Sequence, residues 1–121
     1  MTGDKQRLSD YLGHILEAIE RIERFTGNID EIAFLQNEMA QDAVIRNIEI
    51  IGEACHNIEC NFPEFAAAHP ELPLASAYQM RNVVSHGYFK VDLEVVWKTI
   101  QNDLSGLYLQ VQEVLKNGMG N

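Results

Sequence analysis

The chain has 121 residues, the length of one ordinary domain, and no apolar run reaches the roughly 18 residues that a membrane-spanning helix needs. Its net charge of −9 argues against a protein that holds nucleic acid over a broad basic surface, because phosphate binding depends on Lys and Arg. Two cysteines are too few for a disulfide scaffold, and the N-terminus lacks the apolar stretch of a signal peptide. We therefore expect a single domain, residues 1–121, in the cytoplasm.

Apolar residues near the start of the chain recur at steps of three and four, which predicts an amphipathic helix that ends near residues 26–28. This first stripe consists of Leu8, Leu12, Ile15, Ile19 and Ile22. Asp30 is suited to cap a second helical stretch, which we expect to break near Asn37 and to stop at Pro63. Its stripe consists of Ile32, Leu35, Met39, Val44, Ile48, Ile51, Cys55 and Ile58.

The second half of the chain predicts three further helical segments. Three prolines in residues 63–73 favour a short helical turn between two breakers. We expect a helix over residues 74–85, with Gly87 as its C′ residue, and a last helix that Asp92 caps and whose apolar stripe spans residues 93–114. Because no alternating run is long enough for a sheet, the pattern predicts an all-α, antiparallel up-and-down bundle of four to five helices.

Two cysteines and two histidines in residues 55–69 are of the types that ligate zinc: Cys55, His56, Cys60 and His69. Their spacing is poor for a metal site, since the two cysteines are five residues apart and lie about 140° apart around a helix. Cys55 also belongs to the apolar stripe, where a buried free thiol is common. We therefore expect no metal site and no cofactor.

Two neighbouring residues stand out in the second helical stretch. Gly52 interrupts a helical pattern at a cost of about 1 kcal/mol relative to Ala, so we expect another backbone to approach closely there. Glu53 could assist a site, although a solvated or locally paired carboxylate is the more common arrangement. Neither residue indicates a function alone.

The segment MRNVVSHGYF, residues 80–89, brings an arginine and a histidine to the end of a predicted helix. Arg81 and His86 would lie about 140° apart on a continuous helix, so both can serve one ligand only if the helix ends near His86. Arginine offers a planar fork of donors to phosphate oxygens, and histidine can transfer a proton at neutral pH. Asn82, four residues before His86, could hold the imidazole in one orientation. Residues 72–91 contain no Asp or Glu, which supports a local phosphate site.

These side chains suit cleavage of RNA by its own ribose 2′-hydroxyl, with the histidine as base or acid and the arginine stabilising charge on the phosphate. DNA lacks this internal nucleophile, so we expect RNA and not DNA as the substrate. The alternative is a capped helix end whose polar side chains face water, since polar residues near helix C-termini are common. The residue pattern leaves that alternative open.

Four segments resemble the HEPN superfamily and, within it, the HepT-like toxins, over nearly the whole chain. They are QDAVIRNIEIIGEA (41–54), ELP (71–73), MRNVVSHGYF (80–89) and VDLEVVW (91–97). The specific part is the family's Arg-x4-His-x-Tyr motif, which Arg81, His86 and Tyr88 match. Asn82 corresponds to the asparagine that often follows the arginine. Leu74 stands where the family often has tryptophan, so the packing there is expected to differ.

The resemblance implies an all-α HEPN domain, a homodimer that brings two motifs to one cleft, and metal-independent endoribonuclease activity with Arg81 and His86 as catalytic residues. It also implies the toxin role in a bacterial or archaeal type VII toxin–antitoxin system. The antitoxin would be a nucleotidyltransferase similar to MntA that transfers AMP from ATP to Tyr88, where the added negative charge would repel RNA. The alternative is a non-catalytic HEPN interaction module that partners a nucleotidyltransferase.

Overall fold

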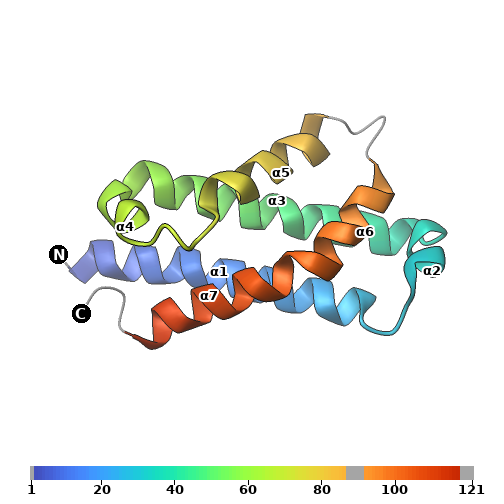
Figure 1. Cartoon of the computed structure of the whole chain (residues 1–121), viewed down its shortest axis with the longest axis horizontal. Helices are drawn as coiled ribbons and strands as arrows, with labels where there is room; N and C mark the ends of the chain where they lie inside the picture. Colours follow the sequence, from blue (N-terminus) through green and yellow to red (C-terminus); the bar gives the residue numbers. More distant parts are fainter. Residues whose placement is uncertain (1, 87–91, 118–121) are drawn as a thin grey trace.

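The computed structural model describes residues 2–86 and 92–117, with side chains at 6–81 and 92–117. Two long helices, α1 (Thr2–Thr26) and α3 (Glu38–Asn61), run antiparallel along the molecule (Figure 1). Every regular element in the described ranges is a helix, so the predicted all-α fold is confirmed. The first predicted stripe accounts for α1, because Leu12, Ile15 and Ile19 are fully buried.

A short helix, α2 (Glu31–Leu35), precedes α3, and the predicted break lies at Asn37. Oδ1 of Asp30 accepts a hydrogen bond from the Ala33 N–H at 2.8 Å. Oδ1 of Asn37 accepts one from the Ala40 N–H at 3.0 Å. Each side chain satisfies a backbone donor that has no partner within the first turn of its helix. The two caps therefore fix where the chain turns back along α1.

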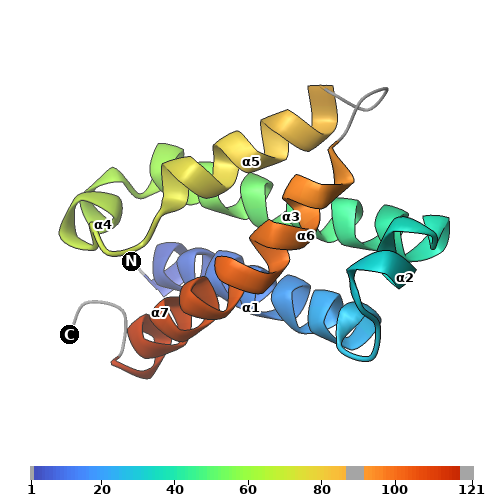
Figure 2. The same ribbon diagram turned by 45° about the vertical axis from the view of Figure 1, so that its right-hand side comes forward.

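Helix α4 (Pro63–Ala68) confirms the short helical turn between prolines, and α5 (Leu74–His86) confirms the helix that carries the motif. Helix α5 packs along α3 and runs antiparallel to it (Figure 2). Leu74 and Ala77 are buried on its inner face. Helix α3 therefore has α1 on one side and α5 on the other.

The last predicted helix is divided into α6 (Leu93–Asn102) and α7 (Leu104–Lys116), so its prediction as one continuous helix is wrong. Asp103 separates the two segments, as the C-cap of the first and the N-cap of the second. Helix α6 packs on α2, with Trp97 against Phe34, whereas α7 packs on α1. The break lets each segment follow a different partner. Because of the break at Asp103 and the short helices α2 and α4, the described residues form seven helices rather than four to five.

The core lies mainly between α1, α3 and α7. Its fully buried large side chains are Leu12, Ile15, Ile19, Ile22, Phe34, Val44, Ile48, Ile51, Cys55, Ile58 and Val111. Burying one such aliphatic side chain contributes about 1.5–3 kcal/mol, so this layer dominates the stability of the bundle. No helix in residues 2–86 and 92–117 is both long and apolar enough to cross a membrane.

Candidate functional site

Arg81, the predicted catalytic arginine, lies on the face of α5 that contacts α3, directly against Gly52. A Cβ atom at position 52 would overlap with Cβ of Arg81, and would lie 2.8 Å from its Cγ and 3.3 Å from the Ala77 carbonyl oxygen. Glycine is therefore the residue that fits this contact without a shift of one helix. The close approach predicted at Gly52 is confirmed, and it seats the motif arginine against α3.

Glu53, next to Gly52 on α3, forms an ion pair with Arg81, and its Oε2 lies 3.5 Å from the Arg81 Nη2. A locally paired carboxylate was one of the two common arrangements expected for Glu53. Its partner is the motif arginine. The contact is longer than the about 2.7–2.9 Å of a strong charge-assisted hydrogen bond. The Glu53 side chain is 56% exposed, so water screens the pair and an incoming phosphate can compete for the guanidinium.

One helical turn away, His56 of α3 stacks on Tyr78 of α5, with ring centroids 4.1 Å apart and ring planes inclined by 15°. His56 follows Glu53 by three residues and Tyr78 precedes Arg81 by three, so the two pairs form successive rungs between the helices. Cys60 extends this row by a further turn, with Sγ 3.6 Å from His56 Nε2. The α3–α5 contact therefore carries a row of polar side chains along an edge that water reaches.

The four side chains considered as zinc ligands do not all meet. Cys55 is buried, and burial together with the Glu59 carboxylate raises the pKa of its thiol to about 12. Cys60 is exposed. His69 pairs with Glu71, with Nδ1 2.9 Å from Oε2, and this hydrogen bond lowers the pKa of the Glu71 carboxyl. Among the described residues, no group of three or more His, Cys, Asp or Glu side chains is placed to hold a metal ion.

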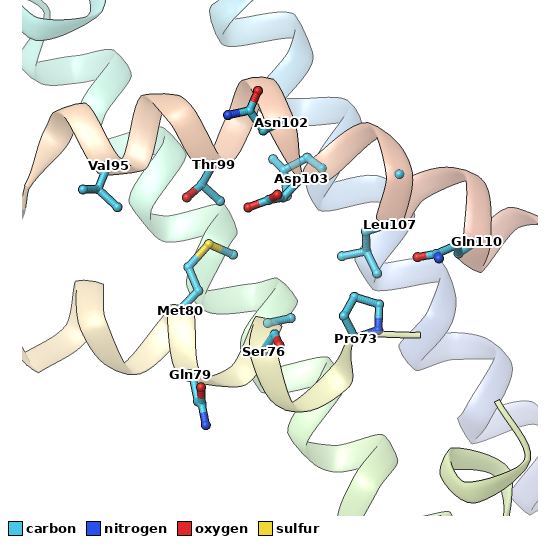
Figure 3. Close-up of a pocket in the computed structure, with 13 residues that line it drawn as sticks. Pro73, Ser76, Gln79, Met80, Val95, Thr99, Asn102, Asp103, Leu107 and Gln110 are labelled. Atoms are coloured by element: carbon cyan, nitrogen blue, oxygen red, sulfur yellow. The ribbon is translucent and has the colours of Figure 1, made fainter. Parts of the chain in front are cut away.

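A groove of about 650 Å³ separates α5 from α6 and α7 (Figure 3). Met80 projects into it from α5, toward Thr99 of α6. Of the described residues that line this groove, Asp103 alone is ionisable, and Arg81 is not among them. The described lining thus offers no cation for phosphate and no histidine for proton transfer. Arg81 lies at the α3–α5 contact and not in the described lining of the groove.

Among the predicted site residues, the structure describes the side chain of Arg81 alone. Asn82 and His86 belong to α5, but their side chains lie outside the described ones. Tyr88 and Gly87 lie outside the described residues altogether. The roles of these four residues, and the meeting of Arg81 with His86, stay predictions.

The Glu53–Arg81 ion pair and the His56–Tyr78 ring stack were not predicted from the sequence. Pairing across two helices depends on how one helix lies along the other, which the apolar period of each helix does not give. A usable signal was Gly52, because a glycine inside a helix marks a close contact and residues one turn away face the same partner. His56, four residues after Gly52, follows from that reasoning.

The fold and the site define a class of protein. It is an all-α bundle in which an arginine lies at a helix–helix contact, on the helix that carries the Arg-x4-His pattern. Residues 15–114 match the family model described as "Ribonuclease HepT-like". The matched range includes α3, α5 and the whole motif. The chain belongs to the HepT-like ribonuclease family.

Three relatives are similar to the chain over most of their length. The protein called "Probable ribonuclease HepT" of Thermococcus cleftensis is 43% identical over 112 residues, covering 93% of this chain and 99% of the relative. A "Putative RNase" of Caldanaerobacter subterraneus is 36% identical over 107 residues, 88% of this chain and 92% of the relative. One of Methanocaldococcus jannaschii is 34% identical over 110 residues, 91% of this chain and 98% of the relative. No solved structure matches the chain significantly.

Proposed function

We propose that this protein is the toxin of a type VII toxin–antitoxin system and acts as a metal-independent endoribonuclease. The observation that carries the proposal is the family match over residues 15–114, which contains the motif. The packing of Arg81 Cβ and Cγ against Gly52 supports it, because this contact holds the base of a side chain whose guanidinium suits the recognition of a phosphate. The relatives called ribonucleases support the same class of reaction.

The proposed reaction begins when His86 takes the proton of a ribose 2′-hydroxyl, whose oxygen then attacks the adjacent phosphorus. Arg81 stabilises the negative charge that develops on the phosphorus oxygens. The bond from phosphorus to the 5′-oxygen breaks, and this oxygen accepts a proton from the imidazolium of His86 or from solvent. The products are a 2′,3′-cyclic phosphate and a 5′-hydroxyl. Asn82 supports the reaction by holding the imidazole of His86 in one orientation.

RNA is expected to bind this acidic protein only locally. Residues 72–91 contain no Asp or Glu and include Arg81 and Lys90, whereas the whole chain has a net charge of −9. Glu53 of α3 forms an ion pair with Arg81 of this segment. We therefore expect the phosphate to displace Glu53 from Arg81 when RNA binds, which is possible because the ion pair is exposed.

Two partners belong to the proposal. The active form is a homodimer in which two motifs share one cleft. A nucleotidyltransferase similar to MntA is the antitoxin: the phenol oxygen of Tyr88 attacks the α-phosphorus of ATP, and pyrophosphate leaves. The adenylate adds a bulky negative charge beside the RNA site, which disfavours RNA binding by like-charge repulsion. The reaction takes place in the cytoplasm.

Cleavage of a labelled RNA in the presence of EDTA tests the proposed activity. Arg81→Ala and His86→Ala should each lower cleavage by roughly 10² or more, because each removes a group that acts on the transition state. The double variant should be little worse than the poorer single variant, since the two residues serve one step. Arg46→Ala and His14→Ala, which change exposed residues on other helices, are the matched controls.

Two results would contradict the proposed activity. One is cleavage that disappears in EDTA, and the other is cleavage that persists in His86→Ala with normal helicity by circular dichroism. Either result would favour the capped helix end, because cleavage would then not depend on the motif. Absence of cleavage by folded wild-type protein would favour the non-catalytic interaction module. The dimer is tested separately, because a folded and fully active monomer would contradict it.

Incubation with the partner nucleotidyltransferase and ATP tests the proposed modification. Wild-type protein should gain the mass of AMP, and Tyr88→Phe should not. Tyr88→Phe should keep cleavage activity but escape the partner's control, which separates modification from catalysis. Tyr108→Phe, which changes a tyrosine of α7 whose hydroxyl donates to Glu20 of α1, is the control and should be labelled like wild type. Equal labelling of Tyr88→Phe would exclude the site.

A further inference from the structure

Tyr78 of α5 differs from the other described tyrosines in what covers its ring. Tyr11 and Tyr108 are half-buried and pack against the hydrophobic core. Tyr78 is also half-buried, but it is not among the residues that pack against the core, and its ring stacks on that of His56 instead. Its hydroxyl makes no hydrogen bond among the described residues, whereas that of Tyr108 donates to Glu20. Core packing therefore does not account for an aromatic residue at position 78.

The stack of Tyr78 on His56 is the flattest ring contact in the described part of the chain. The two ring planes are inclined by 15°, with centroids 4.1 Å apart, whereas the other aromatic pairs there are inclined by 35° or more. Both residues keep part of their surface exposed. A parallel ring pair can be continued by a third planar ring, which is how proteins hold unpaired bases on aromatic side chains.

The ring stack lies beside the arginine that is expected to contact phosphate. Tyr78 precedes Arg81 by three residues on α5, so their side chains lie on the same face, with roughly 5–6 Å between the Cβ atoms. His56 likewise follows Glu53, the ion-pair partner of Arg81, by three residues on α3. The base and the phosphate of one nucleotide, or of two neighbours, can span such a separation. A phosphate at Arg81 therefore brings a base within reach of the stack.

Charge near the stack favours a base over a second phosphate. Glu53 and Glu59 flank His56 on α3, each three residues away, and their carboxylates repel a phosphate. A nucleobase carries no charge at neutral pH, so this repulsion does not act on it. Tyr78 itself belongs to residues 72–91, which contain no Asp or Glu. The tyrosine side of the stack is therefore the side that suits RNA.

We propose that Tyr78 stacks on a nucleobase of the RNA, next to the phosphate that Arg81 contacts. His56 is a positioning residue that holds the tyrosine ring from its other face. The subsite rests on the proposed function and deepens it, because it assigns single-stranded RNA as the substrate class: the faces of paired bases are hidden in a duplex. Every base has such a face, so the subsite holds RNA without selecting one sequence.

Binding of two oligonucleotides with the same sugar–phosphate backbone tests the subsite. One is an intact 2′-O-methyl RNA, whose blocked 2′-oxygen prevents cleavage, and the other is its fully abasic analogue. Wild-type protein should bind the intact strand at least about fivefold more tightly in fluorescence anisotropy, because stacking of one base has about this effect or more. It should also bind the single strand more tightly than the duplex of the same sequence.

Substitutions at the stack should change this intact-to-abasic preference. Tyr78→Ala should bring the affinity ratio close to one and leave binding of the abasic strand unchanged, whereas Tyr78→Phe keeps the ring and should keep the ratio. Tyr78→Leu, which retains apolar contact with α3, should lose the ratio as well, so the test does not depend on the folding of the alanine variant. His56→Ala should lower the ratio, and His56→Phe, which can still stack on Tyr78, should restore it.

Tyr11→Ala is the matched control, with helicity checked by circular dichroism. Tyr11 also neighbours a histidine, His14, but their centroids are 6.5 Å apart, their rings meet at 74°, and both belong to α1. Removing this ring should leave the ratio unchanged.

A ratio near one in wild type, or a ratio that survives in folded Tyr78→Leu, would overturn the subsite and leave the stack as a contact between two helices. The failures of the two proposals are distinguishable, because the 2′-O-methyl strand reports binding alone. A protein that binds bases through Tyr78 but cleaves no RNA would contradict the proposed function and support the subsite. Cleavage by a protein whose binding does not depend on Tyr78 would contradict the subsite alone.

Discussion

The two faces of α3 differ in burial and in chemistry. The core stripe, which faces the interior, consists of Val44, Ile48, Ile51, Cys55 and Ile58, all fully buried. The site stripe, which runs along α5, consists of Gly52, Glu53, His56 and Cys60. The core stripe gains its energy from apolar burial, whereas the site stripe places an ion pair, a ring stack and a thiol where water reaches them. On the proposed function, this helix carries stability on one face and the contacts of the motif arginine on the other, and substitutions on the two faces should have different effects.

The largest effect is expected on the core stripe. Ile51→Ala removes a fully buried side chain between α3 and its neighbours and leaves a cavity, so it should lower the free energy of unfolding by about 2–5 kcal/mol. Urea denaturation followed by circular dichroism measures this loss. Ile32→Ala is the matched control, because Ile32 is 68% exposed and should lose little. The folded fraction of Ile51→Ala should cleave RNA at the wild-type rate, and a selective loss of activity would contradict the separation of the two faces.

Cys55 makes the core stripe sensitive to alkaline pH. Burial raises the pKa of its thiol from 9.0 to about 12, so the folded state keeps the proton while the unfolded state releases it above about pH 9. The unfolded state then binds fewer protons, and stability falls as pH rises from about 9 toward 12. The stability difference between wild type and Cys55→Ala should shrink between pH 8 and pH 11 in urea denaturation, by an amount on the order of 1–3 kcal/mol. A difference that stays constant over this range would show that Cys55 ionises as easily in the fold as in solution.

The core stripe could be predicted from the sequence, whereas most of the site stripe could not. Steps of three and four among apolar residues fix which face of a helix is buried, so Ile48, Ile51 and Ile58 followed directly from the pattern. The breaks at Asn37 and Pro63 also followed, because a capping side chain and a missing N–H act locally. The break at Asp103 could not be predicted, since it depends on which helix α6 and α7 each pack against.

Contacts of the site stripe depend on the register between α3 and α5, which no periodicity encodes. Gly52 predicted a close contact with another backbone, but not that Arg81 would be the residue in contact with it. Glu53 therefore looked like a solvated or locally paired carboxylate, and its partner became clear only in the fold. The family resemblance named the motif residues in advance, while their side-chain geometry beyond Arg81 lies outside the described residues.

Gly52→Ala tests the closest contact of the site stripe. The added Cβ would overlap with Arg81 Cβ, so α5 must move away from α3, at a cost of about 1–3 kcal/mol that a gain of about 1 kcal/mol in helix propensity partly offsets. RNA cleavage should fall at least tenfold, because the arginine moves with its helix. Gly13→Ala on α1 is the matched control: nothing lies within 4 Å of its added Cβ, so it should stabilise the protein and leave cleavage unchanged. Wild-type cleavage in Gly52→Ala would show that the seat of Arg81 does not matter for the reaction.

The smallest effect is expected at Glu53, where charge and shape can be separated. Glu53→Gln keeps the length of the side chain and an oxygen beside the Arg81 guanidinium, but removes the negative charge that competes with phosphate. An exposed pair of this kind is worth about 0.2–1 kcal/mol, so KM for RNA should fall roughly two- to fivefold with little change in kcat. The difference should shrink at high salt, because salt screens exposed charges.

Two comparisons sharpen the role of Glu53. Glu53→Ala also removes the oxygen that orients Arg81, so kcat should fall although the same charge is lost. Glu17→Gln breaks another exposed pair, between Glu17 and Arg21 of α1 with 3.9 Å between Oε1 and Nη2, and should change neither constant. If Glu53→Gln lowers kcat as much as Glu53→Ala does, the carboxylate charge itself holds Arg81 in its working position. If KM rises instead, Glu53 aids RNA binding rather than competing with it, and the displacement of Glu53 by phosphate is wrong.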